Sequence, residues 1–195
     1  MLNAQQQVPA AIEAARLNNL GTALIGQQFL DRAVTTFAAA AKADPNLTLA
    51  RINEGIALLY LQKSTLAEPL LEAAATEDPK DPHAWYALGL LYRNQNQPEK
   101  ALDAFHKVAV LKPADPDTHY MIASVYFEIN DLPHSRAEYQ KALELDPHHA
   151  SAIFGLAREL RREGDTAGAQ QTLARFQHVT SAKLGTPLSH NYGEE

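Results

Sequence analysis

Residues Trp85–Pro113 read WYALGLLYRNQNQPEKALDAFHKVAVLKP and place large, small and helix-stopping residues at fixed distances from Gly89. In chain order, these residues are Trp85, Tyr92, Ala101, Phe105 and Pro113. Spacings of three and four residues put side chains on one face of a helix, and proline ends a helix. The stretch therefore predicts two amphipathic helices that are joined by the turn NQNQP and ended by a proline.

The same spacing recurs with a period of 34 residues. The small residues that anchor the five copies are Gly21, Gly55, Gly89, Ala123 and Ala157. Glycine inside a helix costs about 1 kcal/mol relative to alanine, so we expect the partner helix to cross closely at these positions. One helix pair cannot bury its apolar face alone, and consecutive pairs must stack. The sequence therefore predicts an all-α fold, an α-solenoid of five stacked helix-turn-helix repeats.

These copies set the predicted domain organisation. It consists of an N-terminal lead-in (1–13), an array (14–183) of five repeats (14–47, 48–81, 82–115, 116–149, 150–183), and a C-terminal tail or linker (184–195). Pro69 lies in the expected second helix of the second repeat, where proline removes a backbone hydrogen bond. We expect this helix to be kinked or to start late, near Glu68.

The composition argues against several classes of function. The net charge of −6 disfavours general binding to nucleic acid or anionic lipid, because both need basic surface. No cysteine is present, which excludes disulfides, thiolate metal sites and cysteine nucleophiles. No apolar run approaches the ~20 residues that span a bilayer, so we expect no membrane insertion. The N-terminus shows no signal-peptide pattern, and the default expectation is a cytoplasmic protein.

Catalytic and metal-binding patterns are also missing from the sequence. The eight histidines show no chelating spacing, and the adjacent pair His148 and His149 would point apart on a helix. No Gly-rich phosphate loop or nucleophile motif occurs. We therefore expect no metal, no cofactor, no catalytic residues and no enzymatic activity.

The spaced residues resemble the tetratricopeptide repeat (TPR) family, whose pattern W-x2-L-G-x2-Y…A-x3-F…P is complete in residues 82–115. The fourth copy departs from it with Ala123 and Ser135, and the fifth has Ser181 in place of the final proline. The resemblance covers about residues 14–183 and implies a right-handed superhelix whose first helices line a concave groove. In this family the groove usually binds an extended peptide or a helix of a partner protein, so the resemblance implies a protein-interaction scaffold.

The resemblance also indicates which residues face the groove. In the family, these inward positions lie about three residues before and one, four and five residues after the small residue of each first helix. The candidate binding residues are Asn18, Ile52, Ile56, Tyr60, Tyr86, Leu90, Arg93, Tyr120, Phe127, Phe154, Arg158 and Arg161. Their aromatic members predict an apolar ladder that anchors a partner. The alternative is that several of them pack between neighbouring first helices.

The segment RELRREGD, residues 158–165, carries three arginines at helical spacing, Arg158, Arg161 and Arg162. One interpretation is a basic spot for a carboxylate or an acidic partner segment. The other is a solvated face in which Glu159 and Glu163 lie between the arginines. The carboxylate clamp of chaperone-binding TPR proteins is a separate arrangement and is matched only at Asn53 among Asn18, Thr22, Asn53, His83 and Ala87. Binding of acidic chaperone tails is therefore not expected.

Residues 176–195, FQHVTSAKLGTPLSHNYGEE, resemble the segment that leads from a repeat array into a β-propeller-like region in some large bacterial proteins. This weaker resemblance implies a piece of a longer, exported bacterial protein. It favours an alternative function, a structural spacer or assembly module that docks or forms homo-oligomers through its terminal faces. Leu173, Phe176 and Val179 would then leave an apolar edge at the C-terminal end of the array.

Overall fold

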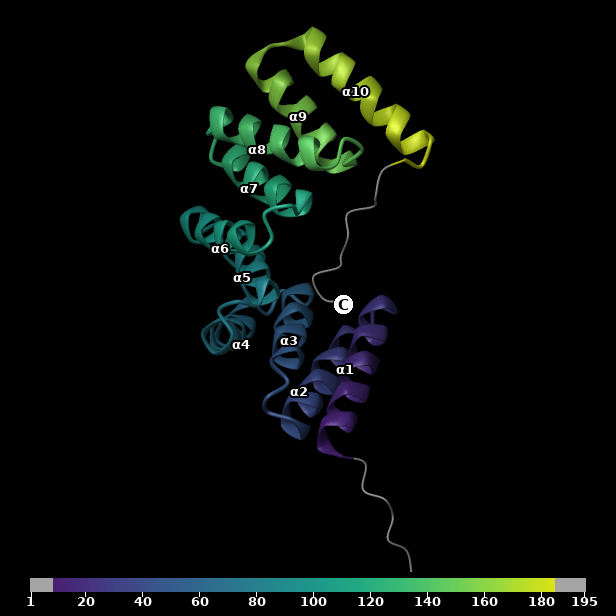
Figure 1. Cartoon of the computed structure of the whole chain (residues 1–195), viewed down its shortest axis with the longest axis vertical. Coiled ribbons are helices and arrows are strands. Elements are labelled where there is room, and N and C mark those ends of the chain that lie inside the picture. Colours follow the sequence, from purple (N-terminus) through teal and green to yellow (C-terminus); the bar gives the residue numbers. More distant parts are fainter. Residues whose placement is uncertain (1–8, 185–195) are drawn as a thin grey trace, which may run out of the picture. The chain divides into compact units, whose positions relative to one another are not determined.

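The computed structural model describes residues 9–184, which form ten α-helices and no strand (Figure 1). The all-α fold built from helix-turn-helix repeats, predicted from the sequence, is therefore confirmed. Residues 1–8 of the predicted lead-in and residues 185–195 of the predicted tail lie outside the described part of the chain. The C-terminal half of the segment compared with a propeller linker lies there too.

The described residues form two compact units, residues 9–91 (unit 1) and residues 92–184 (unit 2). Unit 1 contains α1 (Ala10–Gly26), α2 (Leu30–Ala43), α3 (Thr48–Tyr60), α4 (Ser64–Glu77) and the part of α5 (Pro82–Asn94) up to Leu91. Unit 2 contains the end of α5, α6 (Pro98–Leu111), α7 (Pro116–Glu128), α8 (Leu132–Leu145), α9 (Ala150–Glu163) and α10 (Thr166–Ser181).

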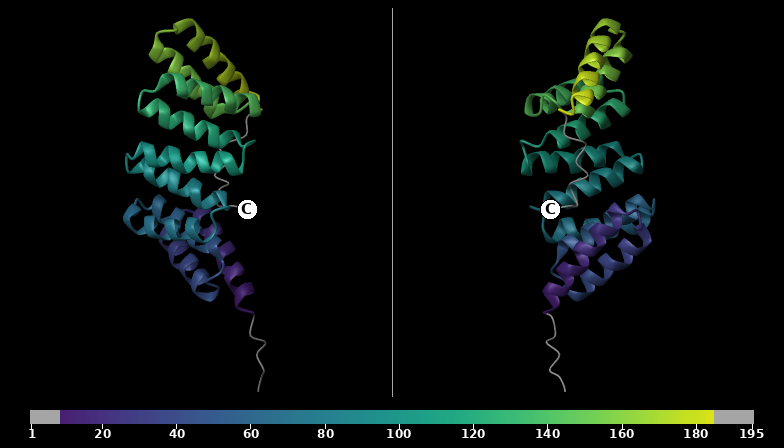
Figure 2. Two further views of the ribbon diagram at one scale, coloured as in Figure 1. Left: turned by 60° about the vertical axis from the view of Figure 1, so that its left-hand side comes forward. Right: turned by 90° about the vertical axis from the view of Figure 1, so that its right-hand side faces the viewer.

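Within each unit, consecutive helices pack against one another in chain order. In unit 1, α1 packs on α2, α2 on α3 and α3 on α4, and α1 also contacts α3. In unit 2 the same order runs from α6 to α10, teal to yellow in Figure 2, and α7 also contacts α9. The first helices of neighbouring repeats therefore lie next to each other, as stacked helix pairs require.

The turn inside each repeat has the same backbone conformation. One residue in each turn has a positive φ, and these residues, again 34 positions apart, are Gln28, Gln62, Asn96, Asn130 and Gly164. The next residue donates its N–H to a carbonyl five positions earlier, for example Phe29 to Leu24 at 2.9 Å. These are the bonds of a Schellman motif, which satisfies the last carbonyls of a helix. The first helix of every repeat therefore ends in the same way.

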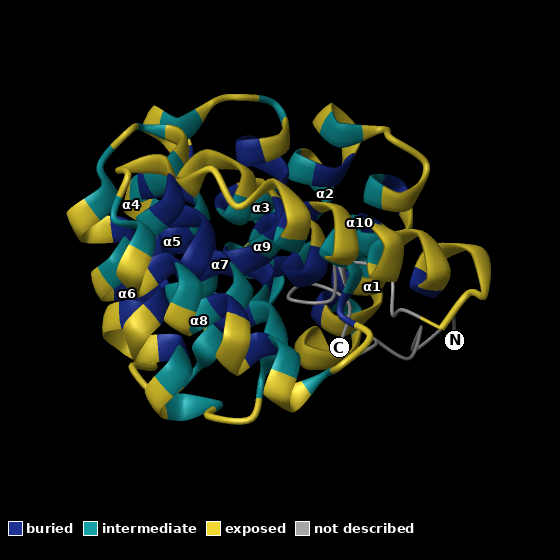
Figure 3. Cartoon of the chain, turned by 90° about the horizontal axis from the view of Figure 1, so that it is seen from above, coloured by how far each residue is buried: buried dark blue, intermediate teal, exposed yellow. Residues whose placement is uncertain are grey.

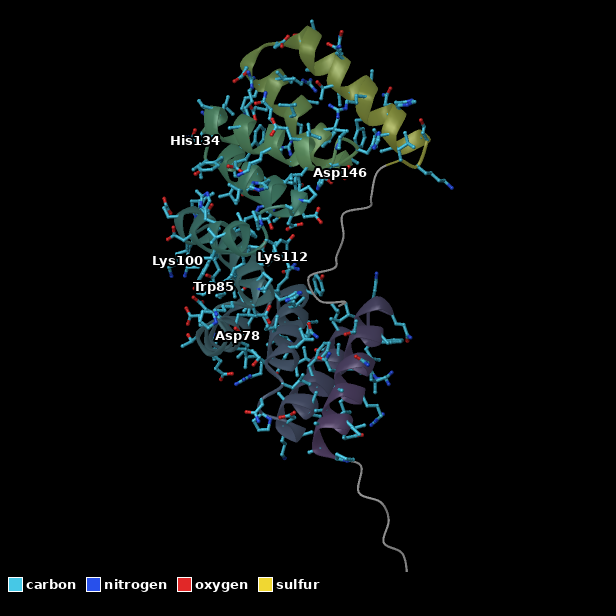
Figure 4. The ribbon with its side chains drawn as sticks, in the orientation of Figure 1. Asp78, Trp85, Lys100, Lys112, His134 and Asp146 are labelled. Carbon is cyan, nitrogen blue, oxygen red and sulfur yellow. The ribbon has the colours of Figure 1, made fainter. Side chains whose placement is uncertain are left out.

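In the first, second and fourth repeats, the second helix ends at an aspartate that precedes a proline. Asp44, Asp78 and Asp146 each accept a hydrogen bond from the backbone N–H two residues later, at 2.9–3.1 Å (Figure 4 labels Asp78 and Asp146). This Asx turn offers the backbone an alternative to helix. The following proline then prevents the helix from continuing. As a result, the chain reverses at the same place in these three repeats.

The close crossing expected at the small residues is present in unit 1. Figure 3 shows helices with buried and exposed sides, as amphipathic helices have. A Cβ atom added to Gly21 would collide with the ring of Phe37, and one added to Gly55 would lie 2.7 Å from Cγ of Leu71. Both large side chains are fully buried. Glycine is therefore needed in α1 and α3 because a large side chain of the second helix lies directly on the backbone.

Helix α4 begins at Ser64 and continues through Pro69, so the expected late start near Glu68 is wrong. Leu66 and Ala67 both donate their N–H groups to the carbonyl of Lys63, at 3.0 and 3.2 Å, and fix the first turn before the proline is reached. A kink at Pro69 stays a prediction.

None of the helices within residues 9–184 is long and apolar enough to cross a membrane.

Candidate functional site

We call the predicted inward positions of the first helices the first-helix surface and describe it separately for each unit. In unit 1, Ile52 is fully buried and Asn18 is 7% exposed, so both belong to the packed interior. Tyr60 at the end of α3 is 45% exposed. The half-buried members are Ile56, Tyr86 and Leu90.

Asn18 and Asn53 connect the two first helices of unit 1. The Asn53 side-chain amide donates a hydrogen bond to Oδ1 of Asn18 at 3.0 Å, and both residues are buried. A buried amide that finds such a partner helps to fix the register of the helices that carry it. Asn53, which matches the carboxylate-clamp pattern, therefore takes part in packing α3 against α1.

In unit 2, the predicted aromatic residues differ in exposure. Phe154 on α9 is 42% exposed, and its ring centroid lies 5.4 Å from that of Phe176 on α10. Tyr120 on α7 is half-buried and lies 6.2 Å from the Tyr139 ring. Phe127 on α7 is only 6% exposed. Phe154 is thus the aromatic residue of this set with the largest exposed surface in unit 2.

Two arginines of α9 cover Phe127. The guanidinium carbons of Arg158 and Arg162 lie 4.8 and 3.9 Å from the centroid of the Phe127 ring. Arg162 also donates a hydrogen bond to the Phe127 carbonyl oxygen at 2.9 Å. Cation–π contacts of this kind hold a guanidinium without neutralising its charge. They keep both positive charges at the first-helix surface.

The glutamates of α9 face a different helix. Nε of Arg136 on α8 donates to Glu159 at 3.1 Å, and its guanidinium also pairs with Glu163. Glu159 is fully buried, and its second carboxylate oxygen has no hydrogen-bond partner. The interpretation of Glu159 and Glu163 as solvated residues between the arginines is therefore wrong for Glu159. Within residues 9–184, no carboxylate forms an ion pair with Arg158 or Arg161.

Arg93, at the end of α5, also lies in unit 2, where its guanidinium pairs with Glu128 of α7. Burial acts to lower the pKa of Arg93, but its hydrogen bond and charge interaction with Glu128 raise the pKa above its ordinary value. This arginine is therefore charged, and its charge is compensated within the unit.

Tyr139 is a residue of this region to which the repeat pattern assigned no binding role. It occupies the Phe position of the fourth repeat on α8, and it is 2% exposed. Its ring lies against Gly155 of α9, where an added Cβ would be 2.7 Å from the Tyr139 hydroxyl. The sequence did offer a clue, because Gly155 is a helical glycine two residues away from the repeating small position, Ala157.

The buried histidines of unit 2 act in packing and capping. His119 lies with Nδ1 2.6 Å from Glu138. Burial acts to raise the pKa of Glu138, but the hydrogen bond and charge of His119, together with the charges of Lys141 and His106, lower it overall. His149 accepts the Ala152 N–H at 3.1 Å as the N-cap of α9. Across residues 9–184, no three histidine, aspartate or glutamate side chains gather as a metal ion would require.

The repeated helix pairs and their surface define a helical-repeat protein. Two sequence models of the tetratricopeptide repeat match, one over residues 52–116 and one over residues 116–149. The chain belongs to the tetratricopeptide repeat family. Arrays of this family generally serve as protein-interaction scaffolds with protein or peptide partners.

Individual relatives are similar over limited regions. The Homo sapiens protein O-mannosyl-transferase TMTC3 is 30% identical over 100 residues, which are 51% of this chain and 11% of that protein. The chain therefore spans about a tenth of the length of this relative.

Two solved structures are similar over most of their length. The structure of MamA residues 41-end from Desulfovibrio magneticus RS-1 superimposes with a TM-score of 0.75 at 20% identity, covering 88% of this chain and 97% of that one. YrrB, a TPR protein with an unusual peptide-binding site, gives 0.66 at 18% identity, covering 92% and 89%. These structural likenesses support the fold.

Proposed function

We propose that this chain is a protein-interaction scaffold that holds a peptide or helix of a partner protein on its first-helix surface. The observation that carries the proposal is the α9 surface of unit 2, where Phe154 is 42% exposed and Arg158 and Arg161 are exposed without a carboxylate partner in residues 9–184. Exposed aromatic and arginine side chains are the residue types that dominate binding energy at interfaces.

The physical basis of the binding is a preformed surface. The Phe154 ring packs near that of Phe176, and its exposed part is available to a partner. Arg158 and Arg162 are held over Phe127, so little side-chain entropy remains to be lost when a partner binds. YrrB carries a peptide-binding site on the same fold, which supports this kind of ligand.

The proposal contains no catalytic step. The transferase named among the relatives matches this chain over 11% of its own length, and the proposal does not extend that activity to this chain.

The proposed binding groups are the exposed and half-buried members of the first-helix surface. In unit 2 they are Tyr120, Phe154, Arg158 and Arg161, and in unit 1 they are Ile56, Tyr60, Tyr86 and Leu90.

The test uses a displayed library of random 12-residue peptides selected on the full chain. Selected peptides are synthesised, and their affinity is measured by fluorescence anisotropy. We expect Phe154→Ala to weaken binding about tenfold or more, as loss of an interface anchor does. The matched control is Val110→Ala, since Val110 on α6 is 81% exposed but lies on a second helix. Equal affinity of both variants, or failure to select any peptide, would refute the proposal.

A structural spacer that assembles through its end faces is a second candidate function. On α10, Leu173 and Phe176 are half-buried, and the following Leu184 is 48% exposed. Val179, by contrast, is 2% exposed and offers no surface. Sedimentation velocity across a hundredfold concentration range tests this function, because self-association through α10 should increase with concentration and should be lost in Leu184→Ser.

A further inference from the structure

The Tyr139 hydroxyl is a polar group of unit 2 without a hydrogen-bond partner in residues 9–184. The side chain starts on α8, packs with Ala123, Ala142 and Ala152, and is 2% exposed. Among residues 9–184 no group forms a hydrogen bond with its hydroxyl, yet this oxygen is not one of the enclosed, unpartnered atoms. The ring is therefore buried while the oxygen still reaches solvent.

Gly155 allows the hydroxyl to reach this position. With a Cβ at residue 155 the ring would collide, and the hydroxyl would be only 2.7 Å from the added atom. In the other repeats the equivalent positions hold Asn19, Asn53, Ala87 and Met121, all of which have a Cβ. In the fifth repeat the missing Cβ thus leaves room beside α9, and the Tyr139 ring and hydroxyl fill this room.

Burial is the main reason why the Tyr139 hydroxyl stays protonated, and Arg158 is among the charged groups that influence its pKa. Burial raises the pKa of Tyr139, Tyr120 and Glu159 raise it further, and Arg158 and Arg93 act in the opposite direction. A phenol with a raised pKa is a hydrogen-bond donor throughout the physiological range. Arg158 is close enough to influence it and lies one helical turn after Gly155.

Helix α9 and the side chains paired with it carry an excess of positive charge, although the chain has a net charge of −6. Together with the pair of Arg93 and Glu128, the charged residues of this group are Arg93, Arg136, Arg158, Arg161, Arg162, Glu128, Glu159 and Glu163. All three glutamates are paired, one with Arg93 and two with Arg136. The three arginines of α9 are left without a carboxylate partner within residues 9–184.

We propose that the Arg158 guanidinium and the Tyr139 hydroxyl together bind the carboxylate of an acidic side chain in the partner segment. A carboxylate accepts both a charge-assisted bond from arginine and a bond from a neutral hydroxyl. Phe154 lies one turn before Arg158 on the same face of α9, so a neighbouring apolar residue of the partner would meet its exposed ring. This inference rests on the proposed function, because the carboxylate belongs to a segment held on the first-helix surface.

The direct test is an NMR titration of the full chain, labelled with ¹⁵N-arginine, with N-acetyl-glutamate amide as the carboxylate probe. We expect the Nε–H signal of Arg158 to shift saturably, and the isosteric N-acetyl-glutamine amide to cause no shift. Arg32 of unit 1 is an internal control, since it is exposed and lies 5.4 Å from the Phe29 ring without a tyrosine hydroxyl in the motif. Tyr139→Phe should weaken the titration about fivefold, the value of one hydrogen bond.

An Arg158 signal that shifts no more than that of Arg32 would overturn the inference, as would equal affinity of wild type and Tyr139→Phe. The peptide selection described above separates this failure from that of the proposed function. Selected peptides that bind through Phe154 but lack enriched aspartate or glutamate would refute the carboxylate site and leave the scaffold role standing. A saturable carboxylate titration without any selected peptide would refute the scaffold role and leave the anion site standing.

Discussion

Phe37 of unit 1 and Tyr139 of unit 2 occupy the same position of the repeat but are accommodated differently. Phe37 lies on Gly21 of its own repeat and is fully buried. Tyr139 has Ala123 at the corresponding place and lies instead against Gly155 of the following repeat. The glycine that accommodates the large side chain thus lies in the same repeat for Phe37, and in the next repeat, two residues before the small position, for Tyr139.

The cause of this difference is the presence or absence of a single Cβ atom. In unit 1 the glycine leaves room for the ring above α1, so Phe37 needs no space in the next repeat. In unit 2 the Ala123 methyl group fills that room, and the opening at Gly155 takes its place. Interiors are close-packed, so a side chain follows whatever volume its neighbours leave.

The largest effect that the comparison predicts is that of Phe37→Ala. We call the space that the Phe37 ring fills the unit 1 slot, and the space that the Tyr139 ring fills the unit 2 slot. The substitution should lower the free energy of unfolding by about 3–5 kcal/mol, because it leaves a cavity in the closed unit 1 slot. Urea unfolding followed by circular dichroism measures the change. The control Val110→Ala should stay within about 0.5 kcal/mol of wild type, because Val110 is 81% exposed. A loss below about 1 kcal/mol for Phe37→Ala would mean that the slot is not tightly packed.

Adding a hydroxyl to the unit 1 slot tests whether the two slots really differ. Phe37→Tyr should cost about 1–3 kcal/mol, because Phe37 is fully buried and the new hydroxyl would lose water without gaining a partner. The same unfolding assay applies. If Phe37→Tyr is neutral, the unit 1 slot is open to solvent as well, and the contrast with Tyr139 disappears.

Closing the opening in unit 2 should have a smaller net effect. Gly155→Ala gains about 1 kcal/mol of helix propensity but pushes against the Tyr139 ring, so we expect a net loss of about 1–2 kcal/mol. The matched control is Gly26→Ala, since a Cβ there meets nothing within 4 Å. The loss should shrink in a Tyr139→Leu background, because Leu71 and Ala87 are the natural pair at the equivalent positions. An unchanged loss in that background would show that Tyr139 is not what Gly155 accommodates.

The repeating part of this fold could be predicted from the sequence, and the site could be predicted only in part. Proline and glycine act locally, so the helix end before Pro113 and the close crossing at Gly21 followed from spacing alone. The direction of each polar side chain on α9 did not, because Glu159 turns to Arg136 on α8 while Arg158 turns to Phe127 on α7. Spacing gives the face of a helix, but only packing tells which neighbour that face meets.

The smallest effect at neutral pH is expected for Tyr139→Phe, and its pH dependence is the most direct test of the difference between the two slots. The hydroxyl has no hydrogen-bond partner in residues 9–184, so its removal should change stability by no more than about 0.5 kcal/mol at pH 7. Burial raises the pKa of Tyr139 above its ordinary value of 10.0, so on raising the pH the unfolded chain loses this proton first.

Wild-type stability should therefore fall above pH 10, by up to about 1.4 kcal/mol per pH unit relative to Tyr139→Phe. Urea midpoints of both proteins, measured between pH 7 and pH 11, give the difference directly. Because Phe37 has no proton to lose, Phe37 makes no such contribution in unit 1. Parallel curves would show that Tyr139 has the same pKa in the folded and the unfolded chain, and that the burial of its ring does not shield the hydroxyl from water.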